Sequence, residues 1–328
     1  GVPSGEFTTG EFTFAGEDEL LEPKTDRSKV IASRYEIASL IATGAMGQVL
    51  HVRHRRLGKS FALKLMQADT STNPDAVKLF EREARLASAL SHPNIVSIVD
   101  FGEDPDWGLF ITMEHLQGQP LSAHIALEGK LSVEIACTIA RQVASALQHS
   151  HEMAVVHGDV KSDNVFWLDE EEQGIRTKLL DFGMASLDSK RKERSGEIAG
   201  TPEYMAPERI VGNPPAPSND IYALGIVLYE MLHGSTPFVG GEPGDVLKRH
   251  LEINPAPIQV REGEVLSPEL ESIVDKALQK DPTQRYQQIE EMKEDLKALL
   301  SDQGFDDTRS GVMELPGVAA ERIEAGRA

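Results

Sequence analysis

The chain of 328 residues contains one cysteine, Cys137, and so cannot form an internal disulfide. Cys137 lies in an apolar stretch with helical spacing, where a small buried side chain is the main interpretation and a reactive thiol the alternative. Both fit a reducing compartment. No run reaches the ~18 apolar residues of a membrane span, and the longest candidate, Ile221–Leu232, is interrupted by polar residues and a glycine. No signal peptide is visible. We therefore expect a cytoplasmic protein with no membrane segment in this chain.

Positive charge is also scarce, because 33 Lys and Arg face 53 Asp and Glu, for a net charge of −20. That charge repels phosphates and excludes nucleic acid as the main partner. The glycines are aperiodic and no internal repeat or heptad run is visible, which excludes collagen, solenoids and coiled coils. The hydrophobic fraction of 40% is ordinary for a globular protein. At about 150 residues per domain, the length predicts two domains or lobes.

The two ends of the chain differ from its middle. Residues 1–33 and 301–328 are acidic and aperiodic, and we predict that both are disordered tails. The first part of the middle is mostly strand-like, with short β-rich runs at 35–42, 48–53, 61–66, 96–101 and 110–114 and one helix at 74–90. Helices dominate afterwards, at 132–152, 219–233, 243–252, 268–279 and 287–300. A small β-rich lobe followed by a larger helical lobe is an α+β arrangement in two parts.

A glycine-containing turn between Ile41 and Val49 joins two of the predicted strands. Gly44 and Gly47 would let the backbone approach phosphates closely and offer N–H donors to them. An ordinary hairpin turn is the alternative interpretation. A dinucleotide-binding fold would need a helix directly after the glycines. A strand follows instead, so that fold is excluded.

Two charged residues lie within apolar segments nearby. Lys64 lies in a strand, and Glu83 lies nineteen residues later in the predicted helix. Each alone is most simply a solvent-facing residue. Together they would form an ion pair that aims Lys64 at a phosphate.

The most informative block runs from Val155 to Val165, in a loop between apolar runs. It contains Asp159, which can accept a proton from a hydroxyl, and Asn164, whose amide oxygen suits Mg²⁺ because this ion prefers hard oxygen ligands. Asp181 ends an apolar strand seventeen residues beyond Asn164 and could supply a second oxygen ligand. A turn or cap role explains any one of these residues but not the whole ordered set.

This ordered set resembles the bacterial Hanks-type (eukaryotic-like) serine/threonine protein kinases over about residues 35–299. The resemblance implies a bilobal protein-kinase fold in a kinase domain at 34–300, with an N-lobe at 34–113, a hinge at 114–118 and a C-lobe at 119–300. It implies ATP and Mg²⁺ as cofactors. The implied activity is transfer of the ATP γ-phosphoryl group to Ser or Thr hydroxyls of proteins, including the kinase itself.

The resemblance also implies a role for each matching residue. The catalytic residues are Asp159, Lys161, Lys64, Glu83 and Thr201, and the Mg²⁺ ligands are Asn164 and Asp181. The nucleotide-binding residues are Ile41, Gly44, Gly47, Val49, Ala62, Lys64, Met113, Glu114, Leu116 and Phe166. Outside the site, Asp220 would brace the catalytic loop and Glu208 would pair with Arg285.

Two positions depart from the family pattern. Ala42 replaces the first glycine of the glycine-rich loop, which would weaken nucleotide binding if that position needs a positive φ. Gly158 replaces the arginine that normally pairs with a phosphate on the activation loop. We therefore expect activity to depend only weakly on phosphorylation of Ser186, Ser189 and Ser195.

Two rival functions are kept open. The His-Gly-Asp triplet at 157–159 also resembles small-molecule kinases of the aminoglycoside and choline type, which fit poorly with Lys161 and with the segment from Thr201 to Glu208. A catalytically silent pseudokinase scaffold is the other rival, and it fits poorly because every polar residue that the chemistry needs is present.

The N-terminal tail predicts one possible binding partner. Thr8, Thr9 and Thr13 lie in an acidic setting that would suit a phosphothreonine-reading domain, and an inert tail is the alternative. A homodimer is also kept open.

Overall fold

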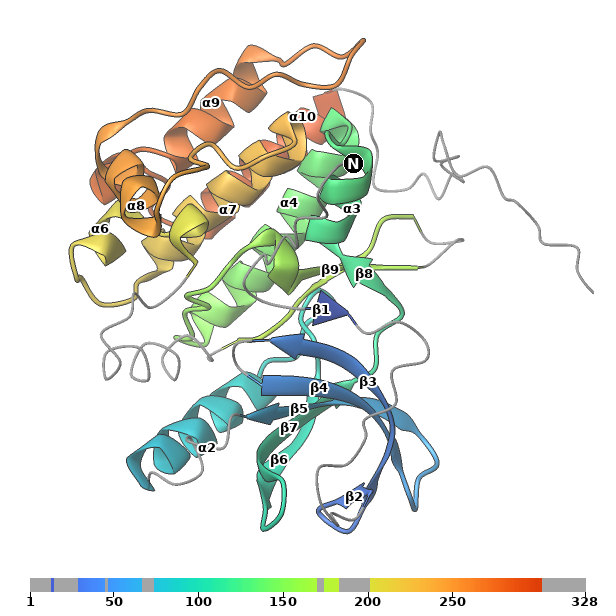
Figure 1. Ribbon diagram of the computed structural model, residues 1–328. Coiled ribbons are helices and arrows are strands. Elements are labelled where there is room, and N and C mark those ends of the chain that lie inside the picture. The colour runs from blue at the N-terminus through green and yellow to red at the C-terminus, as the bar shows by residue number, and fades with distance from the viewer. Residues whose placement is uncertain are drawn as a thin grey trace, which may run out of the picture.

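The structure is a computed structural model that describes residues 13–14, 29–44, 47–66, 74–169, 174–182 and 201–302. Figure 1 shows a lobe built on a curled sheet with one helix, joined to a larger lobe made mostly of helices. The predicted α+β, two-lobed class is therefore confirmed. Several predicted positions lie outside the described residues, namely Thr8, Thr9, Ser186, Ser189 and Ser195.

The sheet of the smaller lobe is antiparallel throughout, and the strand-like runs of the sequence form its centre. Its main path follows the order β1-β3-β4-β5-β7-β6, and β2 pairs with β3 off this path. The strands are β1 (Thr13–Phe14), β2 (Val30–Ile31), β3 (Tyr35–Gly44), β4 (Gly47–His54), β5 (Ser60–Met66), β6 (Ile98–Asp104) and β7 (Gly108–Glu114).

Two of these strands lie inside the predicted N-terminal tail, and here the structure differs from the prediction. Ile31 is fully buried, and the backbone N–H of the next residue, Ala32, donates to the Asp104 carboxylate at 2.7 Å. Tyr35, beside this contact, bonds Asp100 through its hydroxyl at 2.6 Å. The strand β2 could not be predicted from composition, because only two of its residues pair with β3.

The period-two alternation of the strands separates a core from a functional face. Leu50, Leu63 and Phe110 point to one face and pack with Ile31 and Tyr35 in a buried cluster. Their neighbours in the strands point to the other face, which lies toward the helical lobe. The residues that share this second face in register are Val49, Lys64, Ala62, Ile111 and Met113.

Helix α2 (Pro74–Ser88) covers part of that second face. Its residues Phe80 and Ala84 are fully buried, and they pack with Leu109 and Ile111. The helix begins at a proline, which is favoured in a first turn because its missing N–H would have no partner there. The predicted helix at 74–90 is confirmed to within two residues.

The helical lobe is arranged around α7 (Pro217–His233), which is buried on nearly all sides, as expected for a helix that is apolar all round. Helix α4 (Val133–Glu152) packs against it and buries Cys137 completely. The remaining helices are α3 (Leu121–Glu128), α6 (Pro207–Ile210), α8 (Pro243–Glu252), α9 (Pro268–Ala277) and α10 (Ile289–Asp302), with 3-10 turns η1 (Ser162–Asn164), η2 (Pro202–Tyr204) and η3 (Pro282–Gln284).

The predicted helices of this lobe are confirmed, with ends that shift by two residues or fewer. Helix α3 was not predicted, because its eight residues lack a clear apolar stripe. No helix among the described residues is long and apolar enough to cross a membrane.

A small three-stranded sheet lies where the two lobes meet. It contains β8 (Gly118–Pro120), β9 (Val165–Leu168) and β10 (Thr177–Leu179) in the order β10-β9-β8. The sheet leads the chain from the predicted catalytic loop, residues 155–165, through Phe166 to Asp181. The backbone N–H of Leu180 donates to the Asn164 carbonyl at 2.8 Å, so the residues before β9 and after β10 lie side by side.

Candidate active site

The glycine-containing turn between β3 and β4 closes with Gly44 opposite Gly47. Gly47 has a φ of +136°, and a Cβ at this position would lie 1.8 Å from the Leu65 carbonyl oxygen. Only glycine fits there. Ala42 has no positive φ and lies buried in β3 opposite Val49. The strain expected from replacing glycine at position 42 is therefore absent.

Lys64 and Asp181 join the two lobes through an ion pair of 2.7 Å between Nζ and Oδ2. The Lys64 side chain is only 2% exposed. Burial alone would raise the pKa of Asp181, but the charge and the hydrogen bond of Lys64 outweigh it and hold that pKa below its ordinary value. Asp181 therefore stays ionised at neutral pH. Glu83 lies half-buried on α2, and its pairing with Lys64 remains a prediction.

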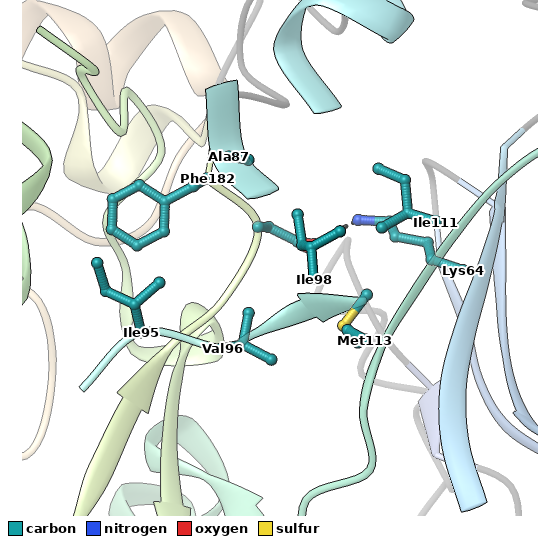
Figure 2. A pocket seen from close by; sticks show the side chains of 9 residues that line it. Lys64, Ala87, Ile95, Val96, Ile98, Ile111, Met113 and Phe182 are labelled. Carbon is teal, nitrogen blue, oxygen red and sulfur yellow. Dashed lines mark hydrogen bonds and ion pairs between the residues drawn. The ribbon is translucent and has the colours of Figure 1, made fainter. Parts of the chain in front are cut away.

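A small pocket borders this ion pair. Figure 2 shows the amino group of Lys64 directed into it, near Ile98 and Ile111, with Met113 at one side. Its volume is about 10 Å³, close to the room that one water needs. Its lining is Lys64, Ala87, Ile95, Val96, Ile98, Ile111, Met113, Asp181 and Phe182. The same pocket is thus lined by Lys64, by Met113, which is expected just before the hinge, and by Asp181, the expected metal ligand.

Glu114, which the sequence predicts to lie in the hinge, contacts the helical lobe through its side chain. Its Oε1 accepts from the backbone N–H of Ser97 at 2.7 Å and from Lys178 Nζ at 2.8 Å. Lys178 also donates to the Ile95 carbonyl at 3.1 Å. Burial would raise the pKa of Glu114, but these donors hold it below the ordinary value. This role of Lys178 was not predicted from the sequence. A lysine inside a short apolar strand is the pattern that could have indicated it.

Three of the predicted residues, Lys161, Asn164 and Thr201, gather around Asp159. Asp159 Oδ2 lies 3.1 Å from Lys161 Nζ and accepts from Asn164 Nδ2 at 3.1 Å. Asn164 Nδ2 also donates to the Asp159 carbonyl at 2.8 Å. Thr201 Oγ1 accepts from Lys161 Nζ at 3.1 Å and lies 3.5 Å from Asp159 Oδ1. An acid, a lysine, an amide and a hydroxyl thus form one connected group.

The backbone of the catalytic loop is held by Asp220, at the start of α7. This carboxylate accepts from the backbone N–H groups of His157 at 2.9 Å and Gly158 at 2.8 Å, and it lies 2.8 Å from His151 Nε2. Asp220 is only 1% exposed. The predicted brace is therefore confirmed. Gly158 has a φ of +77°, the left-handed region that favours glycine.

His157 links this loop to the strand that ends near Asp181. Its Nε2 lies 2.7 Å from the Leu180 carbonyl, and its ring meets Phe182 edge-on. Because Nε2 faces a carbonyl, it carries the proton, and Nδ1 accepts from the Asp159 backbone N–H at 3.2 Å. Complete burial lowers the pKa of His157, so it is neutral and structural.

The predicted pair of Glu208 and Arg285 is also confirmed. The guanidinium contacts both carboxylate oxygens, at 2.7 and 2.8 Å, and lies over the Tyr222 ring. Arg285 donates further to the carbonyls of Gln279 and Ser218. This buried cluster anchors α6, which follows Thr201, to the C-terminal helices.

The amino-acid sequence matches the model of a known family. The profile of the protein kinase domain matches residues 35–296. The chain belongs to the protein kinase domain family. The chain is 35% identical over 285 aligned positions to the serine/threonine-protein kinase pkn3 of Myxococcus xanthus, an alignment that covers 84% of this chain and 52% of pkn3.

Other proteins similar to this chain are bacterial serine/threonine kinases as well. It is 34% identical to PrkC of Bacillus subtilis, covering 87% of this chain and 43% of PrkC. It is 34% identical to PknA of Mycobacterium tuberculosis, covering 78% of this chain and 59% of PknA. The chain therefore spans about half the length of these relatives.

Solved structures agree with this assignment. The crystal structure of the PknI kinase domain of Mycobacterium tuberculosis superposes on the kinase domain with a TM-score of 0.63 at 26% identity. The alignment covers 85% of this chain and all of the PknI domain.

Proposed function

We propose that the chain is an ATP-dependent serine/threonine protein kinase domain. It transfers the γ-phosphoryl group of ATP to Ser or Thr hydroxyls of proteins, including its own. The observation that supports this most directly is the connected group of Asp159, Lys161, Asn164 and Thr201, because it combines a proton acceptor, a cation and a potential metal ligand around one carboxylate. The names of the relatives agree with this activity.

In the proposed reaction the acceptor oxygen bonds to the γ-phosphorus, the bond from that phosphorus to ADP breaks, and the acceptor proton passes to Asp159. Asp159 Oδ2 accepts a hydrogen bond from Asn164 Nδ2 at 3.1 Å and lies 3.1 Å from Lys161 Nζ, whereas Oδ1 accepts the longer 3.5 Å hydrogen bond from Thr201 Oγ1. We therefore assign the proton to Oδ1. Lys161 offsets charge on the transferred group. Lys64 contacts the α- and β-phosphates. The protein thus supplies position and charge.

We assign Mg²⁺ binding to Asn164 and Asp181. Asn164 donates through Nδ2, and its Oδ1 accepts no hydrogen bond from the described residues. Asp181 is ionised and contacts Lys64 through Oδ2 only, among the described residues. An amide oxygen and a carboxylate oxygen suit Mg²⁺ at phosphate sites, where one or two protein ligands suffice. Bound Mg²⁺ neutralises charge on the phosphate oxygens.

The nucleotide would lie against the second face of the sheet. Val49 and Ala62 share that face with Lys64. We assign them, with Ile41, Met113, Leu116 and Phe166, to the apolar surroundings of adenine. The predicted set also includes two glycines, Gly44 and Gly47, whose backbone N–H groups would bind the phosphates. The remaining member is Glu114, whose backbone in the hinge would bind adenine.

A single acceptor assay tests the proposal against its two rivals. Labelled ATP and Mg²⁺ are supplied with a basic protein, with a panel of small alcohols and aminoglycosides, or with no added acceptor. We expect label in the protein and in the kinase itself. Label only in small molecules would establish a small-molecule kinase, and no label in any arm would establish a pseudokinase.

We also propose the finer details of partners and location. The tail threonines Thr8, Thr9 and Thr13 are proposed as docking sites for a phosphothreonine-reading domain, and a homodimer and a cytoplasmic location remain proposals. Mass spectrometry after incubation with Mg-ATP tests the tail. If all three threonines stay unmodified in an active preparation, the docking proposal is wrong.

A further inference from the structure

Ser162, directly after Lys161, takes part in a contact group that the proposed chemistry does not use. The residue is 1% exposed, and its hydroxyl lies 2.9 Å from the Tyr204 hydroxyl and donates to Glu230 Oε1 at 3.2 Å. Tyr204 in turn donates to Glu230 Oε2 at 2.8 Å. The three side chains close a ring that joins η1, η2 and α7.

Proton counting shows how this ring is satisfied. When Glu230 is ionised, only the Ser162 and Tyr204 hydroxyls carry protons for the three contacts of the ring, and both hydroxyls donate to the carboxylate. When Glu230 is protonated, three protons serve three contacts. The pKa of Glu230 is raised to about 7, because burial and the nearby carboxylates of Asp163 and Glu203 outweigh the two hydroxyl donors, which lower it. No cation pairs with Glu230 among the described residues, so Tyr204 and Ser162 are its stabilising partners.

The ring lies beside the catalytic group rather than in it. Thr201 is linked to Lys161 at 3.1 Å, and three residues later Tyr204 is linked to Ser162. The segment from Thr201 to Tyr204 is therefore held against the catalytic loop at two successive points. Thr201 Oγ1 lies 3.5 Å from Asp159 Oδ1, so an acceptor whose hydroxyl reaches Asp159 comes next to the start of this segment.

We propose that Ser162 is a positioning residue for the protein acceptor, because its hydroxyl closes the ring with Tyr204 and Glu230 that keeps the 201–204 segment in register with Asp159. This inference rests on the proposed protein kinase function. ATP contacts neither the ring nor η2 in the proposed arrangement. Loss of the ring should therefore weaken acceptor use and leave ATP use intact.

Steady-state kinetics of Ser162→Ala with a protein acceptor tests this. We expect the KM for the acceptor to rise at least fivefold, while the KM for ATP stays within twofold of wild type. Wild type is assayed in parallel. An inactive wild type would refute the kinase function, whereas an active wild type with an unchanged acceptor KM in Ser162→Ala would refute only the role of Ser162.

Ser162→Pro separates loss of the hydroxyl from damage to the backbone. Ser162 is the first residue of η1, Lys161 before it is extended (φ −162°, ψ 166°), and the Ser162 N–H donates to no described residue. Proline suits such a position. Ser162→Pro should therefore reproduce the acceptor effect of Ser162→Ala, and Ser162→Thr, which keeps a hydroxyl, should restore most of the acceptor affinity.

Ser218→Ala is a matched control, because Ser218 also donates to a carboxylate, Glu208 Oε1, at 3.2 Å and lies on the same helix as Glu230. We expect it to leave both KM values unchanged. Tyr204→Phe completes a double-mutant cycle with Ser162→Ala. If the two residues act as one ring, the double variant should lose little more than either single variant. Fully multiplicative effects, or equal changes in the KM for ATP and for the acceptor, would overturn the proposal.

Discussion

Lys64 and Asp181, 117 residues apart in the sequence, form a 2.7 Å ion pair that joins the small lobe to the helical lobe. Lys64 comes from β5 and Asp181 follows β10, so the pair exists only when both sheets have formed and the lobes are docked. Asp181 adopts a φ of +59°, which is unusual for a residue other than glycine. The surrounding contacts hold it there, as is common at functional sites.

Lys64→Met should leave the Asp181 carboxylate without its cation. Removing one partner of a buried pair costs about 3 kcal/mol of unfolding free energy, and urea unfolding measures this. Lys64→Met with Asp181→Ala should cost less than the sum of the two single changes, because no unpaired charge remains. The pKa of Asp181 is lower in the folded protein than its ordinary value of 3.8. The ionised carboxylate therefore stabilises the folded state at pH values above 3.8, and this stabilisation should disappear as the pH falls through the lower pKa of the folded state. Strictly additive losses would contradict the pairing.

Asp159→Asn should remove nearly all phosphoryl transfer, because the amide cannot accept the acceptor proton. Groups of this kind contribute roughly 10²–10⁴-fold. Nucleotide binding, measured by calorimetry, should persist because no proposed phosphate contact is changed. Retention of more than about a tenth of wild-type turnover would exclude the assigned role.

Arg285→Leu should destabilise the helical lobe by about 3–5 kcal/mol, since it leaves Glu208 buried without its guanidinium. Burial would raise the pKa of Glu208, but Arg285 and Asn219 hold it below the ordinary 4.5. The pair therefore stabilises the fold above that pH, and its contribution is lost as pH falls further. Thermal unfolding between pH 3 and 7 should show this acid dependence in wild type but not in Arg285→Leu. The exposed pair of Lys248 and Glu252 is the control, because Lys248→Ala should change nothing measurable.

Gly158→Ala should destabilise the protein by about 1 kcal/mol, because a left-handed φ costs a residue with a Cβ roughly that amount. Gly212→Ala is a matched control with a φ of +91° and open space around its Cβ position. Both variants should lower the melting temperature similarly, but only Gly158→Ala should lower kcat, since it disturbs the backbone beside Asp159. Equal kcat values would show that the loop conformation tolerates the change.

Replacing Ser186, Ser189 and Ser195 by alanine together should leave kcat/KM within tenfold of wild type. The reason is Gly158, which cannot supply the guanidinium that would bind a loop phosphate. The assay uses an added protein acceptor. A larger fall, equal to more than about 1.4 kcal/mol of transition-state stabilisation, would show that another basic residue takes this role.

Local patterns in the amino-acid sequence determine much of this protein. Lys64 in an apolar strand, the ordered residues from Asp159 to Asn164 and Asp181 after a strand are enough to indicate the family, because each signal spans a few residues. The helices α4, α8 and α9 are predictable because their apolar residues recur at helical spacing.

Contacts between distant residues are decided only by the tertiary structure. The strand at Ile31 is too short to give a periodic signal, and its burial depends on Asp104 and on β3. The tie between Glu114 and Lys178 joins residues 64 positions apart. The ring of Ser162, Tyr204 and Glu230 draws on three elements, none of which carries a pattern that indicates the others. Spacing along a chain reports local geometry, whereas these contacts depend on how the lobes and helices pack, so the sequence alone could not specify them.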